Sequence, residues 1–400
     1  MRVFLAVTGA ALLLVACASL PAYPQAQNEG TGKVPGQRRT FSISKFYDTP
    51  SPLPFAEPGD LIRSEEFEQY DLPLNVLAVR ILYHSRSASG QDVAASGVVL
   101  YPDTKAPSGG WPVIAWAHAL NGVARQCAPS LARNVGHGPF LAMYVDLGYA
   151  VVAADYAGLG TSFRNAFSDV QSNAADVIYS LPAARAAVPQ LNSRWLAIGI
   201  REGGPAVVAV AEMENEIRGS NYLGSIAISG LDDLQFRYAG SGPHTLPEMP
   251  VFLAYGIKTV YPEFDVNDIL TDRAVALYQR IAQACGDPSS ESKLGPADVL
   301  KASWRSDSFV MKYFERKTLG QRPAKAPILV ISSADDPAIP MHETEQVISR
   351  MCKQGDRVQF ETYPESVSGR VFGDSVRDQI AWIQARFAGR PATTNCAERP

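Results

Sequence analysis

The sequence contains no long run of like charge and none of the short motifs that bind metals, phosphates or dinucleotides. Its 36 basic and 40 acidic residues give a formal net charge of −4 and are mixed along the 400-residue chain, so we expect no basic surface for nucleic acid. His-Glu-x-x-His, paired Cys-x-x-Cys, a phosphate loop and a dinucleotide fingerprint are all absent. We therefore expect no metal, no cofactor and no nucleic-acid partner. The 46% hydrophobic content excludes a disordered chain and suffices for one large domain or two medium ones.

The N-terminus has the features of an export signal. Arg2 precedes the apolar run VFLAVTGAALLLVA, which is too short to span a bilayer. The letters LVAC, ending at Cys17, resemble the lipobox of bacterial lipoproteins, which implies removal of residues 1–16 and lipidation of Cys17. An ordinary secretory signal is the alternative. Residues 17–40, rich in Pro, Gly and Gln, predict a flexible tether, so we expect a membrane-anchored lipoprotein that faces the periplasm, with the outer membrane as its expected location.

Four cysteines remain when Cys17 is set aside, an even number in a chain that has an export signal. They are Cys127, Cys285, Cys352 and Cys396. Two disulfides are the natural inference for an exported protein. The sequence leaves three pairings open, and free buried thiols are the alternative.

Strand and helix patterns alternate over most of the remaining sequence. Residues 76–85 and 93–103 predict two strands that could pair as a hairpin. Short continuous apolar runs, such as residues 112–118 and 150–155, predict strands buried on both faces of a parallel sheet. The alternation is typical of an α/β protein with a doubly wound, mostly parallel sheet.

The alternation is interrupted once, and this interruption divides the chain. From residue 231 to residue 322 the strand rhythm is lost, and Pro, Tyr and short helical pieces dominate, which predicts a cap or lid inserted over one edge of the sheet. Residues 41–230 and 323–390 are then two parts of one core, and residues 391–400 are a C-terminal tail. A final helix is predicted by four apolar residues on one helical face, Val376, Ile380, Ile383 and Phe387.

The stretch IGIREGG, residues 198–204, stands where an apolar strand pattern ends and a helical pattern begins. Gly199 and Gly203 have the spacing of a nucleophile elbow, the strained strand-to-helix turn that exposes the attacking side chain of a hydrolase. The position between them holds Arg201 instead of serine. Alone, the two glycines are also consistent with close packing of a helix on a strand.

Several segments together resemble the secretory lipase family of α/β-hydrolases over nearly the whole mature length. They are KFYDTP, ILYHS, ASGVVLYP, VIAWAHALNGVARQCAPS, GYAVVAADYAGLG, the elbow and ADDPAIP. The resemblance implies an α/β-hydrolase fold and hydrolysis of carboxylic esters, lipids among them, by a serine, an aspartate and a histidine in that chain order. It also implies that Cys127 pairs with Cys285 and that Cys352 pairs with Cys396.

The catalytic positions implied by this resemblance are only partly filled. Arg201 stands at the nucleophile position, and arginine has no nucleophilic lone pair. Asp336 matches the catalytic acid, with Asp335 as the less favoured register. Ser368 corresponds to the histidine, in a loop that contains no histidine. Without an imidazole the site lacks its general base and acid.

The oxyanion region, which comprises Ala119, Leu120 and Glu202, departs from the family as well. Ala119 stands where family members tend to have glycine directly after a histidine, and alanine is costly there if the backbone φ is positive. Together the departures predict a lipid- or ester-binding protein with impaired catalysis. Residual hydrolysis by a non-standard route is the alternative, and a purely protein-binding role is a further one.

Arg201 has two candidate roles in such a protein. Its planar guanidinium could extend through the space vacated by the histidine and pair with Asp336, since Ser368 is smaller than histidine. It could instead point into the former acyl pocket and bind a fatty-acid carboxylate. Glu202, its neighbour in the chain, is a further candidate partner. We favour the pair with Asp336.

Overall fold

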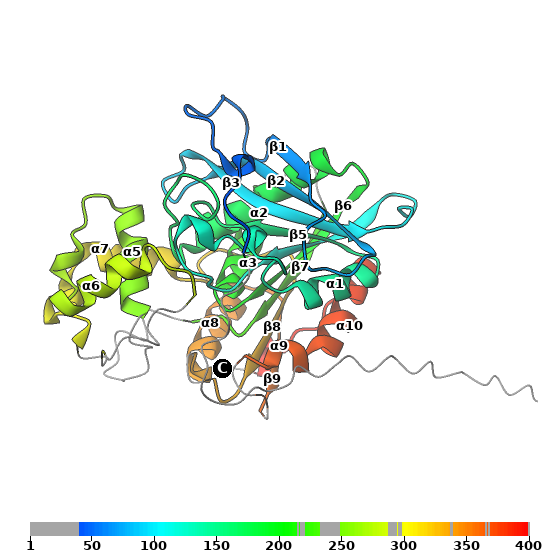
Figure 1. Ribbon diagram of the computed structural model, residues 1–400. Coiled ribbons are helices and arrows are strands. Elements are labelled where there is room, and N and C mark those ends of the chain that lie inside the picture. The colour runs from blue at the N-terminus through cyan, green and yellow to red at the C-terminus, as the bar shows by residue number, and fades with distance from the viewer. Residues whose placement is uncertain are drawn as a thin grey trace, which may run out of the picture. The chain divides into compact units, whose positions relative to one another are not determined.

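A nine-stranded sheet forms the centre of the computed structural model (Figure 1). The structure describes residues 40–213, 216, 221–232, 249–286, 294, 298–336, 339–364, 366 and 369–398. Residues Arg39–Pro400 make up one compact unit. Cys17 and Ser368, for which the sequence predicts lipidation and the histidine position, lie outside the described ranges.

The sheet is mostly parallel, as the sequence predicts. Its strands are β1 (Leu61–Glu66), β2 (Val76–Arg86), β3 (Asp92–Pro102), β4 (Trp111–Ala117), β5 (Ala150–Asp155), β6 (Leu191–Ile200), β7 (Asn221–Ile228), β8 (Ile328–Ser333) and β9 (Val358–Tyr363). They lie in the order β1-β2-β3-β5-β4-β6-β7-β8-β9. From β5 to β9 neighbouring strands run parallel, whereas β1, β2, β3 and β5 pair antiparallel in succession. The predicted hairpin is confirmed as β2 and β3.

Helices cover both faces of this sheet, which confirms the doubly wound arrangement (Figure 1). The described α-helices of the chain are α1 (Gly138–Asp146), α2 (Val170–Ala187), α3 (Gly203–Glu212), α5 (Met249–Val260), α6 (Asp272–Ile281), α7 (Ser308–Lys317), α8 (Met341–Lys353), α9 (Val371–Asp374) and α10 (Val376–Phe387). Buried side chains of α2, α3 and α8 pack against one face. Those of α1, α9 and α10 pack against the other.

Strand β4 shows why the central strands are apolar throughout. Val113 and Ala115 belong to one buried cluster, while Ile114 and Trp116 belong to the cluster on the opposite face. A strand covered on both faces needs an apolar residue at every position. Strand β1 carries no such signal, because its sequence LIRSEE is partly or fully exposed at the edge of the sheet. The sequence patterns did not predict it.

Helices α5, α6 and α7 share a buried apolar cluster of their own and form a separate group in Figure 1. All three fall within residues 231–322, the segment predicted to be a cap. The end of α7 contacts the loop that precedes α2. There Arg316 Nη2 donates to Asp169 Oδ1 at 3.1 Å, and Lys317 Nζ donates to the hydroxyl of Ser168. These contacts join the helical group to the loop before α2.

Two disulfides are present in the described part of the chain. Cys127 pairs with Cys285, with 5.2 Å between the α-carbons, and Cys352 pairs with Cys396, with 5.6 Å between them. This is the pairing that the family resemblance implies. The first disulfide joins the segment after β4 to the segment after α6, and the second joins the end of α8 to the C-terminal tail.

Candidate functional site

Arg201 stands on a tight turn between β6 and α3, and its backbone has a φ of +48°. Its N–H donates to the carbonyl of Ile228 at 2.9 Å, and its carbonyl accepts from the N–H of Gly204 at 2.9 Å. A positive φ at a residue other than glycine costs about 1–3 kcal/mol and requires support from surrounding structure. Arg201 therefore occupies a strained strand-to-helix turn of the kind that presents a nucleophile in hydrolases.

The glycines of the turn are required by close approach of backbone segments. A Cβ added at Gly199 would lie 1.9 Å from the carbonyl oxygen of Gly203, and one added at Gly203 would lie 2.1 Å from that of Ala117. Close packing of backbone segments therefore accounts for the two glycines, and the same glycines flank a turn with the geometry of an elbow. The geometry of the elbow is kept although its central residue is not a nucleophile.

The Arg201 side chain extends from the elbow towards the loops after β8 and β9. Its Nη2 lies 3.9 Å from Oδ2 of Asp336, whose side chain is 3% exposed, whereas the Arg201 side chain is 36% exposed. A Cβ added at Gly369, next to the position of Ser368 in the chain, would lie 3.9 Å from the same Nη2. Asp335 is exposed. Of the two acidic registers, Asp336 is thus the one beside Arg201.

The Glu202 carboxylate points to different partners. It accepts hydrogen bonds from the Ser168 N–H at 2.9 Å and from Asn173 Nδ2 at 3.4 Å. Burial raises the pKa of Glu202 to about 7, and the Ser168 N–H, then Lys317, then Asn173 oppose that increase. Glu202 therefore joins the elbow to the loop before α2 and, through charge, to α7.

Sequence reasoning did not find the residues around Glu202. Ser168, whose φ is +59°, both donates its N–H to Glu202 and accepts from Lys317. These residues are far apart in the chain, and a serine before a helix or a lysine at a helix end is a common surface pattern. No signal in the sequence connects them to the elbow.

Ala119, in the oxyanion region, has no positive φ. Ala119 is not among the described non-glycine residues with positive φ, so the condition under which alanine would be costly there is not met. Its carbonyl accepts from His118 Nδ1 at 2.6 Å, and the His118 ring stacks on Tyr156 at 4.2 Å. Leu120 packs against the apolar cluster of α5, α6 and α7.

Comparisons with known proteins point to one family. A family model described as secretory lipase matches residues 295–395. Lipase 6 of Candida albicans (strain SC5314 / ATCC MYA-2876) is 23% identical over 408 residues, which cover 89% of this chain and 83% of the relative. Probable inactive lipase MT1628 of Mycobacterium tuberculosis (strain CDC 1551 / Oshkosh) is 22% identical, with coverage of 88% and 83%. These matches support the resemblance of this chain to the secretory lipase family.

Solved structures agree with the fold expected of a secretory lipase. Candida antarctica lipase A in its closed state matches with a TM-score of 0.74 at 17% identity, over 88% of this chain and 87% of that chain. The rice cell wall degrading esterase LipA from Xanthomonas oryzae matches with a TM-score of 0.68 at 18% identity, over 83% and 98%. At these low sequence identities, structural similarity shows the fold alone, and it confirms the predicted α/β-hydrolase fold.

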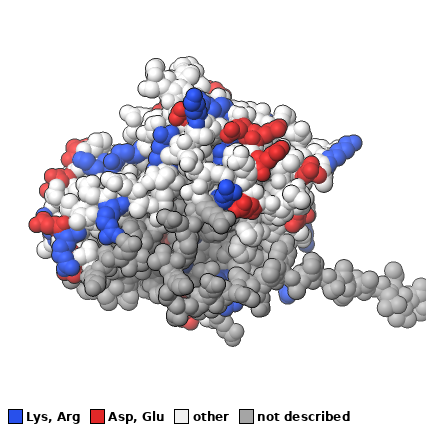
Figure 2. All heavy atoms as spheres, viewed as in Figure 1, with Lys and Arg blue, Asp and Glu red and all other residues white. Residues whose placement is uncertain are grey.

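The surface and helices of the protein add three observations. In the described part of the chain, no helix is both long and apolar enough to cross a membrane. The described side chains include no group of three or more His, Cys, Asp or Glu placed to hold a metal ion. On the face shown in Figure 2, basic and acidic side chains are interspersed.

Proposed function

We propose that the protein is a member of the secretory lipase family that binds a lipid or carboxylic ester without hydrolysing it efficiently. The observation that carries this proposal is Arg201 at the elbow. An arginine side chain stays protonated and offers no lone pair for attack, so it cannot form an acyl-enzyme. Ser368, assigned to the histidine position, cannot replace an imidazole as general base.

In this proposal Arg201 is the structural partner of Asp336. Asp336 is almost fully buried, and a buried carboxylate without a compensating charge is costly. The 3.9 Å separation of Nη2 and Oδ2 supports this role over the capture of a fatty-acid carboxylate by Arg201. The guanidinium thus fills space between nucleophile and acid positions that an imidazole bridges in an intact triad.

The ligand class follows from the family. Lipase 6 and Probable inactive lipase MT1628 carry names that refer to lipases, and the group of α5, α6 and α7, proposed as the cap, offers an apolar cluster beside Leu120. Lipid extracted from the purified protein and measured by mass spectrometry tests this assignment. We expect a stoichiometric fatty acid or ester. Protein free of lipid that also fails to bind added fatty acid would contradict it.

An ester-hydrolysis assay tests the loss of catalysis. We expect purified wild-type protein and its Asp336→Ala variant to hydrolyse a short-chain p-nitrophenyl ester equally slowly, because neither contains a working triad. Turnover by the wild type that Asp336→Ala abolishes would establish residual hydrolysis instead. The double variant Arg201→Ser and Ser368→His is the complementary measurement, and turnover in this variant alone indicates that these two positions account for the loss.

Membrane anchoring through Cys17 is part of the proposal. Membership of a secretory family implies export, and the two disulfides are typical of an oxidising compartment. Several acyl chains on one cysteine give stable anchoring, whereas one chain alone is marginal. We expect radiolabelled palmitate to be incorporated into the wild type and not into Cys17→Ser, and the wild type to fractionate with the outer membrane. Equal labelling of both proteins would contradict the anchor.

A further inference from the structure

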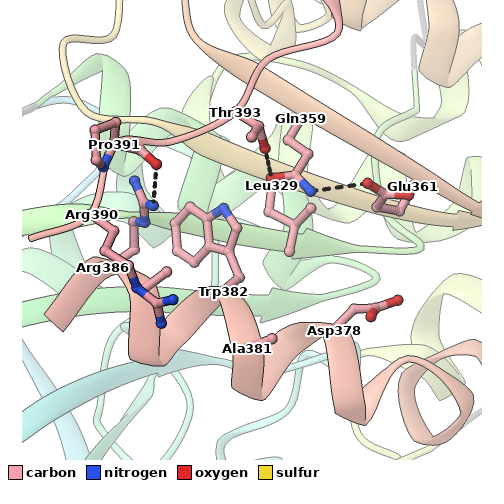
Figure 3. Close-up of a pocket in the computed structure, with 11 residues that line it drawn as sticks. Leu329, Gln359, Glu361, Asp378, Ala381, Trp382, Arg386, Arg390, Pro391 and Thr393 are labelled. Carbon is pink, nitrogen blue, oxygen red and sulfur yellow. Dashed lines mark hydrogen bonds between the residues drawn. The ribbon is translucent and has the colours of Figure 1, made fainter. Parts of the chain in front are cut away.

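A pocket of about 340 Å³ lies between β9, α10 and the C-terminal tail (Figure 3). Gln359 and Glu361 line it from β9, Trp382 and Arg386 line it from α10, and Thr393 lines it from the tail. The elbow residues are not among those that line it. Small-molecule sites usually measure roughly 300–1,000 Å³, so the volume of this pocket suits a small molecule.

The pocket exists because the outer face of β9 is polar. Val358 and Phe360 point into the apolar core on one side of the strand. Gln359 and Glu361 alternate with them and line the pocket on the side of α10. Other strands of the sheet fill this layer with apolar side chains. At β9 the layer stays open and carries hydrogen-bonding groups.

Trp382 and Arg386 bring buried hydrogen-bond donors to this pocket. Trp382 is 6% exposed and Arg386 is 7% exposed. Among the described residues, Nε1 of Trp382 and Nε of Arg386 have no hydrogen-bond partner, while Nη2 of Arg386 donates to the carbonyl of Pro391 at 3.0 Å. The Arg386 guanidinium lies over the Trp382 ring, 5.2 Å from its centroid. Buried donors without an acceptor are costly, which favours an acceptor supplied by a ligand.

Positive charge accumulates at the same end of the pocket. Arg390 also lines it, and burial, then the nearby Arg357 and Arg390, lower the pKa of the Arg386 guanidinium. Within the described part of the chain, no carboxylate forms an ion pair with any of these three arginines. Three like charges without a counter-ion repel one another, and an anion between them would relieve that repulsion.

The acidic residues of the pocket lie at its opposite end and are engaged. Figure 3 shows Asp378 and Glu361 on the side away from the arginines. Asp378 accepts a hydrogen bond from the Tyr363 hydroxyl, and Glu361 accepts one from Gln359 Nε2 at 3.0 Å. They therefore leave the arginine end free to receive an anion.

We propose that this pocket binds a small oxyanion, a carboxylate or a phosphate, between Arg386, Arg390 and the indole N–H of Trp382. The planar guanidinium is suited to paired hydrogen bonds with the oxygens of either group. The indole N–H supplies one further donor at a fixed position. The site is distinct from the proposed lipid site at Arg201 and does not depend on it.

The tail that closes the pocket is held against β9. Thr393 Oγ1 donates to Gln359 Oε1 at 2.7 Å. Asn395 Nδ2 donates to the Phe360 carbonyl at 3.0 Å. The disulfide of Cys396 with Cys352 fixes the end of this segment. The wall formed by the tail is therefore part of a covalently fastened structure.

Isothermal titration of the purified protein, with both disulfides formed, tests the proposal. Inorganic phosphate and citrate are titrated separately at constant chloride and ionic strength, so that general screening is unchanged. We expect one saturable site for at least one of the two anions, and the stronger binder identifies the preferred oxyanion. Arg390→Gln is expected to weaken that binding at least about tenfold, since it removes a charged donor. Arg390 is exposed, so this variant is expected to fold.

Two further variants separate the pocket from general charge. Arg377→Gln removes the same charge from an exposed position of α10 outside the lining residues, and it should leave the affinity within about twofold of the wild type. Trp382→Phe keeps an aromatic ring but removes the N–H, and it should weaken binding roughly threefold to tenfold. Absence of saturable binding for both anions, or an equal effect of Arg390→Gln and Arg377→Gln, would overturn the proposal.

Discussion

The backbone N–H of Ser130 donates to Oδ1 of Asp155 at 2.9 Å, and the Ser130 hydroxyl donates to Oδ2 of the same carboxylate. Ser96 Oγ donates to that Oδ2 at 2.7 Å, and Tyr47 shares a 2.8 Å hydrogen bond with Ser130 Oγ. All four residues are buried. The segments KFYDTP, ASGVVLYP, CAPS and DYAGLG, which carry the family resemblance, thus meet in one polar network of the core. The resemblance at these segments reflects the fold and not the chemistry of the elbow.

Ser130→Ala should destabilise the protein by about 2–3 kcal/mol, because it leaves the buried Asp155 carboxylate without one of its charge-assisted hydrogen bonds. Urea unfolding followed by circular dichroism measures the change. Ser108→Ala, at an exposed position between β3 and β4, is the matched control and should stay within about 0.5 kcal/mol of the wild type. Equal stability of the two variants would show that the network contributes nothing.

The sequence supported the fold better than the site, for a physical reason. Burial on both faces leaves continuous apolar runs, so strands such as β4 and β5 were predictable, whereas the exposed edge strand β1 left no pattern. In α10 the predicted apolar face was only partly right. Ile383 is fully buried, but the other buried residues are Trp382 and the polar Gln379 and Arg386. Hydrophobic periodicity does not report polar groups that are buried because they have partners or line a pocket.

The sequence predicts those parts of the site that depend on the spacing of residues along the chain and on the order of the strands. The turn at Arg201 follows from glycine spacing at a strand-to-helix junction, and its proximity to Asp336 follows from the parallel order of β6, β7 and β8. The contact of Glu202 with Ser168 depends on a loop conformation with positive φ at Ser168, and the charge of Lys317 comes from a helix far along the chain. Neither leaves a local pattern in the sequence.

Arg201→Ala and Arg201→Gly separate the ion pair from the backbone strain at the elbow. Both variants lose the pair with Asp336, so both should be less stable than the wild type, by about 1–2 kcal/mol for the alanine variant because the arginine is partly exposed. Glycine tolerates the φ of +48°, so the free energy of unfolding of the glycine variant should be higher than that of the alanine variant by about 1 kcal/mol. The greater entropy of the unfolded glycine chain reduces this difference. Chemical unfolding measures both differences. An alanine variant as stable as the wild type would show that Asp336 does not require Arg201.

Glu202→Gln should stabilise the protein at pH 8 and have little effect at pH 5. The pKa of Glu202 is raised from 4.5 to about 7 in the folded state. Below about pH 4.5 both states hold the proton. As the pH rises towards 7 the unfolded state ionises first, so the free energy of unfolding of the wild type falls, and above about 7 the loss is complete. Each pKa unit corresponds to about 1.4 kcal/mol, and solvent that reaches this partly exposed side chain reduces the effect. We therefore expect Glu202→Gln to raise the free energy of unfolding at pH 8 by about 2 kcal/mol.

Urea unfolding at both pH values measures the difference in stability between variant and wild type. This difference separates the effect of Glu202 from that of buried carboxyl groups with raised pKa values, such as Asp176. Glutamine keeps an oxygen that can accept from the Ser168 N–H, so the hydrogen bond remains available. A gain of the same size at pH 5 and pH 8 would mean that ionisation of Glu202 does not affect stability.

Removal of the Cys127–Cys285 disulfide should cost more stability than removal of Cys352–Cys396. The two pairs are 158 and 44 residues apart in sequence, and a longer closed loop restricts the unfolded chain more strongly. The loop-entropy relation gives about 5 and about 4 kcal/mol as upper values, a difference of about 1 kcal/mol. Paired Cys→Ala variants, compared by urea unfolding, measure both costs without introducing a buried hydroxyl. If release of the tail costs more than release of the first disulfide, native contacts of the tail with β9 outweigh chain entropy.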